Sequence, residues 1–232
     1  MKVSISFMQN LFQHLKRFWG SNPIIMFVAA IAISASASAR PVSYPEGWTI
    51  MQTNNTNSNN LHVHYSPTAK YSIGYKGEYH RAEEWQFHGI QLNYLARRVN
   101  KKSSQANIYL KSVIGAAYSD YGAFDNKTQA AASIGIATDW ETRRYFTSYE
   151  NRLTYAGDIE KSFEQKARVG IAPYLGNYGD LHTWLMLEVD HSPERADEVI
   201  YTPMVRLFKD VYLFEFGVSS NKDLLINTVI RF

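Results

Sequence analysis

Hydrophobic and polar side chains alternate along most of this chain from residue 48 onward. In residues 70–80, for example, tyrosine or isoleucine fills most odd positions, whereas Lys76, Glu78 and His80 are at even positions. Successive side chains of a β-strand point to opposite faces, so a period of two indicates strands with one apolar and one polar face. The chain is therefore predicted to be all-β.

The pattern predicts about twelve strands, or ten or eight if the shortest segments are loops. The predicted strands are residues 48–53, 60–66, 70–80, 84–97, 105–118, 128–139, 143–156, 162–175, 180–191, 198–208, 211–219 and 222–232. Within residues 84–97 the apolar positions change from odd (Trp85, Phe87) to even (Ile90, Leu92). A β-bulge shifts side-chain alternation, so we expect a bulge near Gly89.

The connections between these strands fall into two alternate sets. One set is mostly polar and includes several long segments, among them residues 54–60, 120–127 and 191–198. The other set is short, as in residues 67–69 and 176–180. Long loops at one end and short turns at the other are typical of bacterial barrels.

No segment after residue 39 has the roughly 20 apolar residues that a membrane-spanning helix needs. Strands can cross a membrane only as a closed ring, because open sheet edges leave unpaired polar groups in hydrocarbon. If the protein enters a membrane, it must do so as a closed antiparallel transmembrane β-barrel, which is the fold that we predict.

The first 39 residues have the layout of a secretory signal peptide. Lys16 and Arg17 precede the apolar run at residues 24–33, and small residues follow, ending at Ala39. A positive flank, a short apolar segment and small residues before the cleavage site define such signals. We therefore predict a cleaved signal peptide at residues 1–39 and a barrel at residues 40–232.

Cleavage changes the charge of the protein. Lys2, Lys16 and Arg17 are lost, so 21 of the 24 basic residues remain against 21 acidic residues, and the formal net charge becomes zero. The basic excess thus belongs to the signal, and nucleic acid is not an expected partner. The chain has no cysteine, which excludes disulfides and a lipid-carrying cysteine.

The final residues repeat the alternation and end in an aromatic side chain. Leu224, Ile226, Ile230 and Phe232 share one apolar stripe. This stripe resembles the C-terminal recognition signal of bacterial outer-membrane β-barrel proteins, without pointing to a subfamily. The resemblance implies the outer membrane of a Gram-negative bacterium, with membrane lipid, lipopolysaccharide and the barrel-assembly machinery as partners. The alternative is a soluble periplasmic β-sandwich or lipid-binding barrel.

If the apolar faces meet lipid, the charged faces line the interior. The predicted lumen residues are Lys76, Glu78, Lys111, Glu150, Arg152, Glu164, Lys166, Arg168, Glu188, Asp190, Arg206, Glu215 and Arg231. Charges of both signs can pair across the lumen, because an unpaired buried charge is costly. They predict either a structural plug of ion pairs or a narrow, weakly selective pore.

Aromatic side chains near the predicted strand ends are interpreted as girdles at the two membrane interfaces. These are Trp48, Tyr71, Tyr79, Trp85, Tyr118, Trp140, Tyr145, Tyr155, Tyr201 and Tyr212. With 16 tyrosines and 14% aromatic residues, the composition fits a protein that has two such interfaces.

Candidate chemistry is sparse. His62 and His64 share a strand face and could supply two ligands to Zn²⁺ or Cu²⁺, but no third ligand follows from spacing. His191 and Ser192 are adjacent, so on a strand they point to opposite faces and do not form a nucleophile–base pair. No cofactor is expected. The sequence favours a small passive channel or structural barrel; the alternatives are an enzyme acting on lipid A or phospholipid, and metal-ion binding or transport through luminal histidines.

Overall fold

The computed structural model describes residues 40–55, 57–177, 179–194 and 196–232, and this part of the chain forms twelve strands. The predicted signal peptide lies outside the described residues. The strands are β1 (Gly47–Asn54), β2 (Ser58–Thr68), β3 (Tyr71–His80), β4 (Trp85–Asn100), β5 (Ser104–Ser119), β6 (Lys127–Thr142), β7 (Tyr145–Ala156), β8 (Glu160–Ile171), β9 (His182–Ser192), β10 (Ala196–Lys209), β11 (Tyr212–Val218) and β12 (Leu224–Arg231). The 3-10 helix η2 (Gly122–Phe124) lies between β5 and β6. Among the described residues, no helix is long and apolar enough to cross a membrane.

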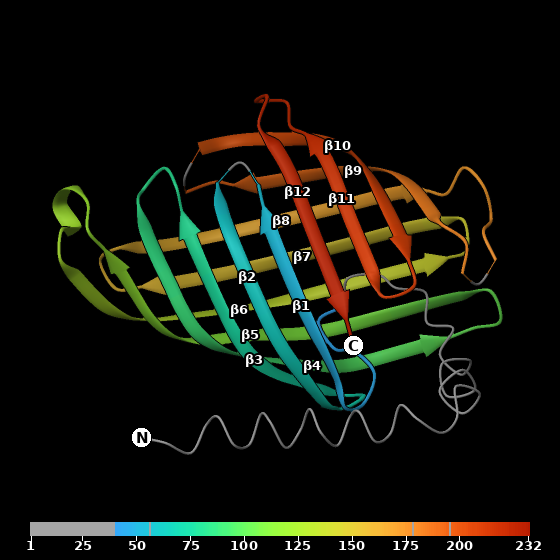
Figure 1. The fold of residues 1–232 in the computed structure, drawn as a ribbon. Coiled ribbons are helices and arrows are strands. Elements are labelled where there is room, and N and C mark those ends of the chain that lie inside the picture. Colours follow the sequence, from blue (N-terminus) through green and yellow to red (C-terminus); the bar gives the residue numbers. More distant parts are fainter. Residues whose placement is uncertain (1–39, 56, 178, 195) are drawn as a thin grey trace, which may run out of the picture. The chain divides into compact units, whose positions relative to one another are not determined.

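The twelve strands form one closed antiparallel barrel, as predicted. Each strand pairs with its neighbour in the sequence, and β1 pairs with β12 through a register that places Thr49 opposite Arg231. Figure 1 shows β1 and β12 side by side, where they close the ring. Because consecutive strands are antiparallel, the connections alternate between two ends. We call the end where β1 begins and β12 ends the terminal end, and the other the loop end.

Side-chain alternation divides the wall into an outer and an inner face. Large apolar side chains on the outer face of the central strands remain exposed, including Ile90 (61%), Ile114 (70%) and Ile134 (60%). Their neighbours in the sequence point inward and are mostly buried or half-buried. The inner face therefore carries most of the polar side chains. A soluble protein shows the opposite arrangement, because it buries its apolar residues.

Two details of the predicted strands are wrong. Gly89 pairs in regular register with Gly115, and the irregularity in β4 lies between Leu95 and Arg97. Trp85 and Phe87 do not share the outer face with Ile90 but point inward, each only 1% exposed, so no change of phase is needed and Trp85 belongs to no outer girdle. The connection after β8 is also longer than expected: it spans residues 172–181 rather than a short turn at 176–180.

Apolar residues fill part of the interior near the loop end. Trp85 and Phe87 pack with small or branched side chains of β5–β7 and the following loop, namely Val113, Ala117, Ala131, Ala156 and Ile159. The Trp85 ring stacks on His80 with centroids 4.0 Å apart. Three alanines provide the space for two large aromatic rings, which explains why β4 can direct them inward.

Candidate functional site: the barrel lumen

The charged residues expected in the lumen lie on the inner faces of β3, β5 and β7–β12. Twelve of the thirteen form the ion pairs described below. The thirteenth, Arg231, is buried near the terminal end and also has an interaction partner. Glu188 and Glu215 are each only 1% exposed. Carboxylates this deeply buried require charged or hydrogen-bonding partners.

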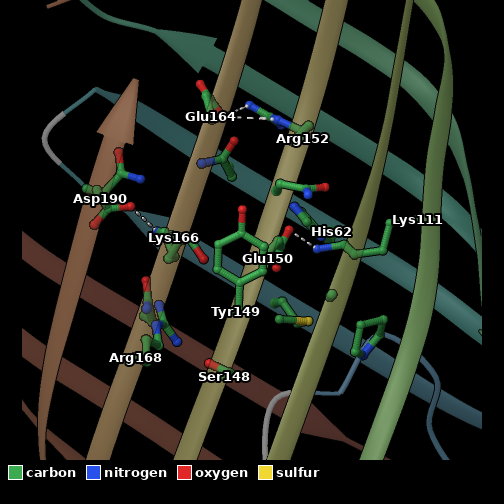
Figure 2. A pocket seen from close by; sticks show the side chains of 18 of the residues that line it. His62, Lys111, Ser148, Tyr149, Glu150, Arg152, Glu164, Lys166, Arg168 and Asp190 are labelled. Atoms are coloured by element: carbon green, nitrogen blue, oxygen red, sulfur yellow. Dashed lines mark hydrogen bonds and ion pairs between the residues drawn. The ribbon is translucent and has the colours of Figure 1, made fainter. Parts of the chain in front are cut away.

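One group of ion pairs crosses the lumen from β3 to β7. Lys76 Nζ lies 2.7 Å from Glu78 Oε1 on the same strand, and the Arg152 guanidinium pairs with the same carboxylate. Arg152 Nη2 also lies 2.7 Å from Glu164 Oε2 on β8 (Figure 2). Since β4, β5 and β6 separate β3 from β7 around the ring, Arg152 reaches across the interior rather than along the wall.

A second group links β8, β9, β10 and β11. Lys166 Nζ lies 3.2 Å from Glu188 Oε1 and 3.1 Å from Asp190 Oδ1. Arg168 pairs with Glu188 and lies 3.4 Å from Glu215 Oε2.

Glu215 has the densest set of partners in this group. Arg206 Nε donates to Glu215 Oε1 at 2.6 Å, and Asn227 Nδ2 donates to Oε2 at 2.6 Å. Lys111 and Glu150 form a separate pair between β5 and β7. The charges thus occur in mixed-sign groups, which lowers the cost of placing them inside the barrel.

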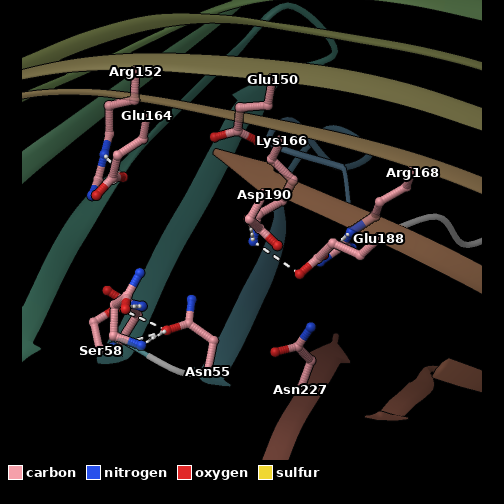
Figure 3. Close-up of polar contacts among 12 residues, drawn as sticks. Asn55, Ser58, Glu150, Arg152, Glu164, Lys166, Arg168, Glu188, Asp190 and Asn227 are labelled. Atoms are coloured by element: carbon pink, nitrogen blue, oxygen red, sulfur yellow. Dashed lines mark hydrogen bonds and ion pairs between the residues drawn. The ribbon is translucent and has the colours of Figure 1, made fainter. Parts of the chain in front are cut away.

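The part of the facing wall that lines the cavity is neutral, since Arg231 of β12 lies outside this lining. Side chains from β1, β2, β12 and the loop between β1 and β2 contribute amides, hydroxyls and imidazole to the lining, namely Thr53, Asn55, Asn57, Ser58, Asn60, His62 and Asn227. Figure 3 shows Asn55, Ser58 and Asn227 apart from the group that contains Glu150, Arg152, Glu164, Lys166 and Asp190. A polar solute between these walls would meet mixed charges on one side and neutral hydrogen-bonding groups on the other.

Between the walls lies a cavity of about 250 Å³. Its lining includes six basic and six acidic side chains, a formal balance of zero. At the loop end it reaches Asn55, Asn57 and Ser192, and toward the terminal end it reaches Pro41. The cavity is therefore balanced in charge and bounded on one side by residues that precede β1.

The histidines proposed as metal ligands both lie on the inner face of β2. His64 is 1% exposed and His62 is half-buried, and both line the cavity. The described residues contain no group of three or more His, Asp or Glu side chains arranged to hold a metal ion. His62 and His64 thus lack a third ligand of these types in the described part of the chain.

The terminal stripe lies on the outer face of β12. Leu224 and Phe232 are 55% and 60% exposed, and Ile226 and Ile230 are half-buried. Phe232 extends the ladder to β1, because Trp48 N donates to Phe232 O at 2.7 Å and Phe232 N donates to Trp48 O at 3.1 Å. The last residue therefore contributes to closure of the ring. Recognition by assembly machinery stays a prediction.

The neutral wall was missed at the sequence level. The sequence predicts a polar connection at residues 54–60, yet β1 extends to Asn54 and β2 begins at Ser58. Asn60 continues the inward series that includes His62 and His64, as its place in the cavity lining shows. The alternation of Ser58, Asn60, His62 and His64 was the available signal.

No family model matches the chain, and no curated protein matches it. Among the solved structures with a similar backbone course are two of a porin. The KdgM porin in complex with disordered oligogalacturonate has 7% identity and a TM-score of 0.48, and covers 80% of this chain and 98% of its own. A structure of the KdgM porin has 6% identity and a TM-score of 0.46, with the same coverage. Such values do not place the chain in a family.

Proposed function

We propose that the protein is a small passive channel in the outer membrane of a Gram-negative bacterium. The observation that carries this proposal is the inversion of polarity in a closed barrel: exposed isoleucine, leucine and tyrosine outside, paired charges and a cavity inside. Hydrocarbon accepts such an outer face, because every strand is paired and none has a free edge.

The aromatic side chains support the membrane assignment. On the outer face, Trp48, Tyr145 and Tyr212 stand near the terminal end, whereas Tyr79 and Tyr155 stand near the loop end. Aromatic residues at both ends of an apolar band are typical of membrane barrels. Outer-membrane lipid and lipopolysaccharide are the proposed surroundings, and the stripe of Leu224, Ile226, Ile230 and Phe232 is the proposed signal for the assembly machinery.

Conductance across a planar bilayer tests the channel directly. The full chain would be expressed with its export signal, purified from membranes in detergent and reconstituted. Stable unitary current steps are expected. Silence at all voltages, from protein that migrates as a folded, heat-modifiable band, would contradict a channel that is open at rest.

The balance of lumen charges predicts weak ion selectivity. In a KCl gradient, we expect a reversal potential close to zero, because neither sign of charge dominates the lining. Glu164→Gln should shift the reversal potential in the direction of anion selectivity. Lys166→Gln should shift it by a similar amount in the direction of cation selectivity. Both side chains are partly exposed to the cavity, at 24% and 27%. Shifts in the same direction for the two variants would contradict the proposed lining.

A further inference from the structure

The segment before β1 packs inside the barrel. Val42 is 1% exposed and forms a buried cluster with Leu95 of β4, Tyr109 of β5 and Ala137 of β6. These three residues point into the lumen, as their burial and the register of β4–β6 show. A residue that precedes the first strand thus occupies space enclosed by the wall.

Polar contacts hold the same segment in place. The carbonyl oxygen of Pro41 accepts hydrogen bonds from Ser72 Oγ at 2.6 Å and from Asn93 Nδ2 at 3.1 Å. The amide of Ser43 donates to Ser66 Oγ at 3.0 Å. The three partners come from the inner faces of β2, β3 and β4 at the terminal end.

An ion pair fixes the start of the segment. The Arg40 guanidinium pairs with Glu141 on β6, and their side chains are 9% and 7% exposed. Residues 40–43 therefore contact the wall from β2 to β6, on the terminal side of the cavity, whose lining includes Pro41. In this position they narrow the path through the barrel.

The segment is held differently from the strands. In the described part of the chain, the first backbone-to-backbone hydrogen bond between the residues before β1 and the barrel wall is made by Glu46, whose amide donates to Ser66 O at 2.7 Å. A tight turn precedes this point, with Gly47 N donating to Tyr44 O at 3.1 Å and with Glu46 at a left-handed φ of 64°. Residues 40–43 can therefore leave the lumen without breaking a strand ladder.

We propose that residues 40–43 form a gate that closes the terminal end of the lumen, with Arg40–Glu141 as its latch and residues 44–47 as its hinge. This inference rests on the proposed channel. Cleavage after Ala39, expected from the sequence, would give the gate a free end. The gate opens when the Val42 cluster and the latch are both released, and the polar cavity then continues to the terminal end.

Two substitutions should open the gate. Val42→Asp places a charge in the apolar cluster, and Glu141→Arg replaces the attraction to Arg40 with repulsion. Removing one partner of a buried ion pair is strongly unfavourable, so we expect the open probability to rise by about tenfold or more in either variant. Lys209→Glu, an exposed change at the terminal end outside the gate, is the matched control and should behave like the parent protein.

A reversible cross-link that holds the gate closed provides a second test. The natural chain has no cysteine, so Val42→Cys combined with Ala137→Cys introduces the only possible disulfide. The oxidised double variant should stay in its lowest conductance state, and reduction should restore gating. Each single cysteine variant controls for the substitutions themselves, and mass spectrometry verifies the cross-link.

The outcomes separate the gate from the channel. All proteins are compared in the same bilayers after their heat-modifiable bands show that they are folded. Unitary currents that are the same in the parent, Val42→Asp, Glu141→Arg and the oxidised double variant would overturn the gate and leave the channel standing. Silence of every folded variant, including both opening substitutions, would overturn the channel and the gate together.

Discussion

Replacing Ile114 by arginine is expected to destabilise the folded barrel in lipid by about 2–4 kcal/mol, the range for a basic residue near the middle of the bilayer. Ile114 lies on the outer face of β5 and is 70% exposed. If this face meets hydrocarbon, the guanidinium loses its hydration on folding. Equilibrium unfolding in urea from lipid vesicles, followed by tryptophan fluorescence, measures the change.

A second substitution on the same strand provides the control. Ala106 also lies on the outer face of β5 but near its terminal end, where a basic residue costs only about 0–1 kcal/mol. We therefore expect Ala106→Arg to be clearly milder than Ile114→Arg. Equal effects at the two positions, or no effect at Ile114, would show that this face does not lie in hydrocarbon.

Loss of the Glu215 charge should destabilise the folded barrel at least as much as Ile114→Arg does. Glu215→Gln removes the carboxylate that pairs with Arg206 and Arg168, and Arg206 is itself only 3% exposed. An arginine left without its partner in a buried site costs roughly 3–5 kcal/mol. The same unfolding measurement in lipid vesicles gives the free energy, and we expect the loss to fall in this range.

The control and the rescue distinguish pairing from packing. Lys209→Gln alters an exposed residue of β10 and should change stability by no more than about 0.5 kcal/mol. Combining Glu215→Leu with Arg206→Met removes both charges, and apolar replacements of a buried pair are often neutral, so stability should largely return. A Glu215→Gln variant as stable as the parent would contradict the role assigned to the pair.

Alternation revealed the strands because it follows directly from backbone geometry. The period of two along residues 70–80 or 224–232 fixes which side chains share a face, whatever the rest of the chain does. It does not fix partners across the interior. Arg152 meets Glu78 only because the sheet curls and brings β3 within reach of β7 across the interior, a contact between residues 74 positions apart.

The errors in the sequence analysis have physical causes. A rule that apolar side chains face lipid predicts Trp85 and Phe87 on the outer face, but Ala117, Ala131 and Ala156 leave room for them within the barrel. Residues 40–43 have no periodic pattern, so the sequence does not predict that Arg40 and Val42 enter the lumen. Their contacts are tertiary, and they depend on the closed wall that receives them.

Spin labels on two adjacent residues of β5 test the central claim most directly. Leu110 is predicted to face lipid and Lys111 the lumen, and the absence of native cysteine allows Leu110→Cys and Lys111→Cys to be labelled singly. In lipid vesicles, the label at 110 should be relaxed mainly by oxygen, and the label at 111 mainly by a water-soluble nickel complex. Strong relaxation of both labels by the nickel complex would contradict a barrel whose outer face lies in hydrocarbon.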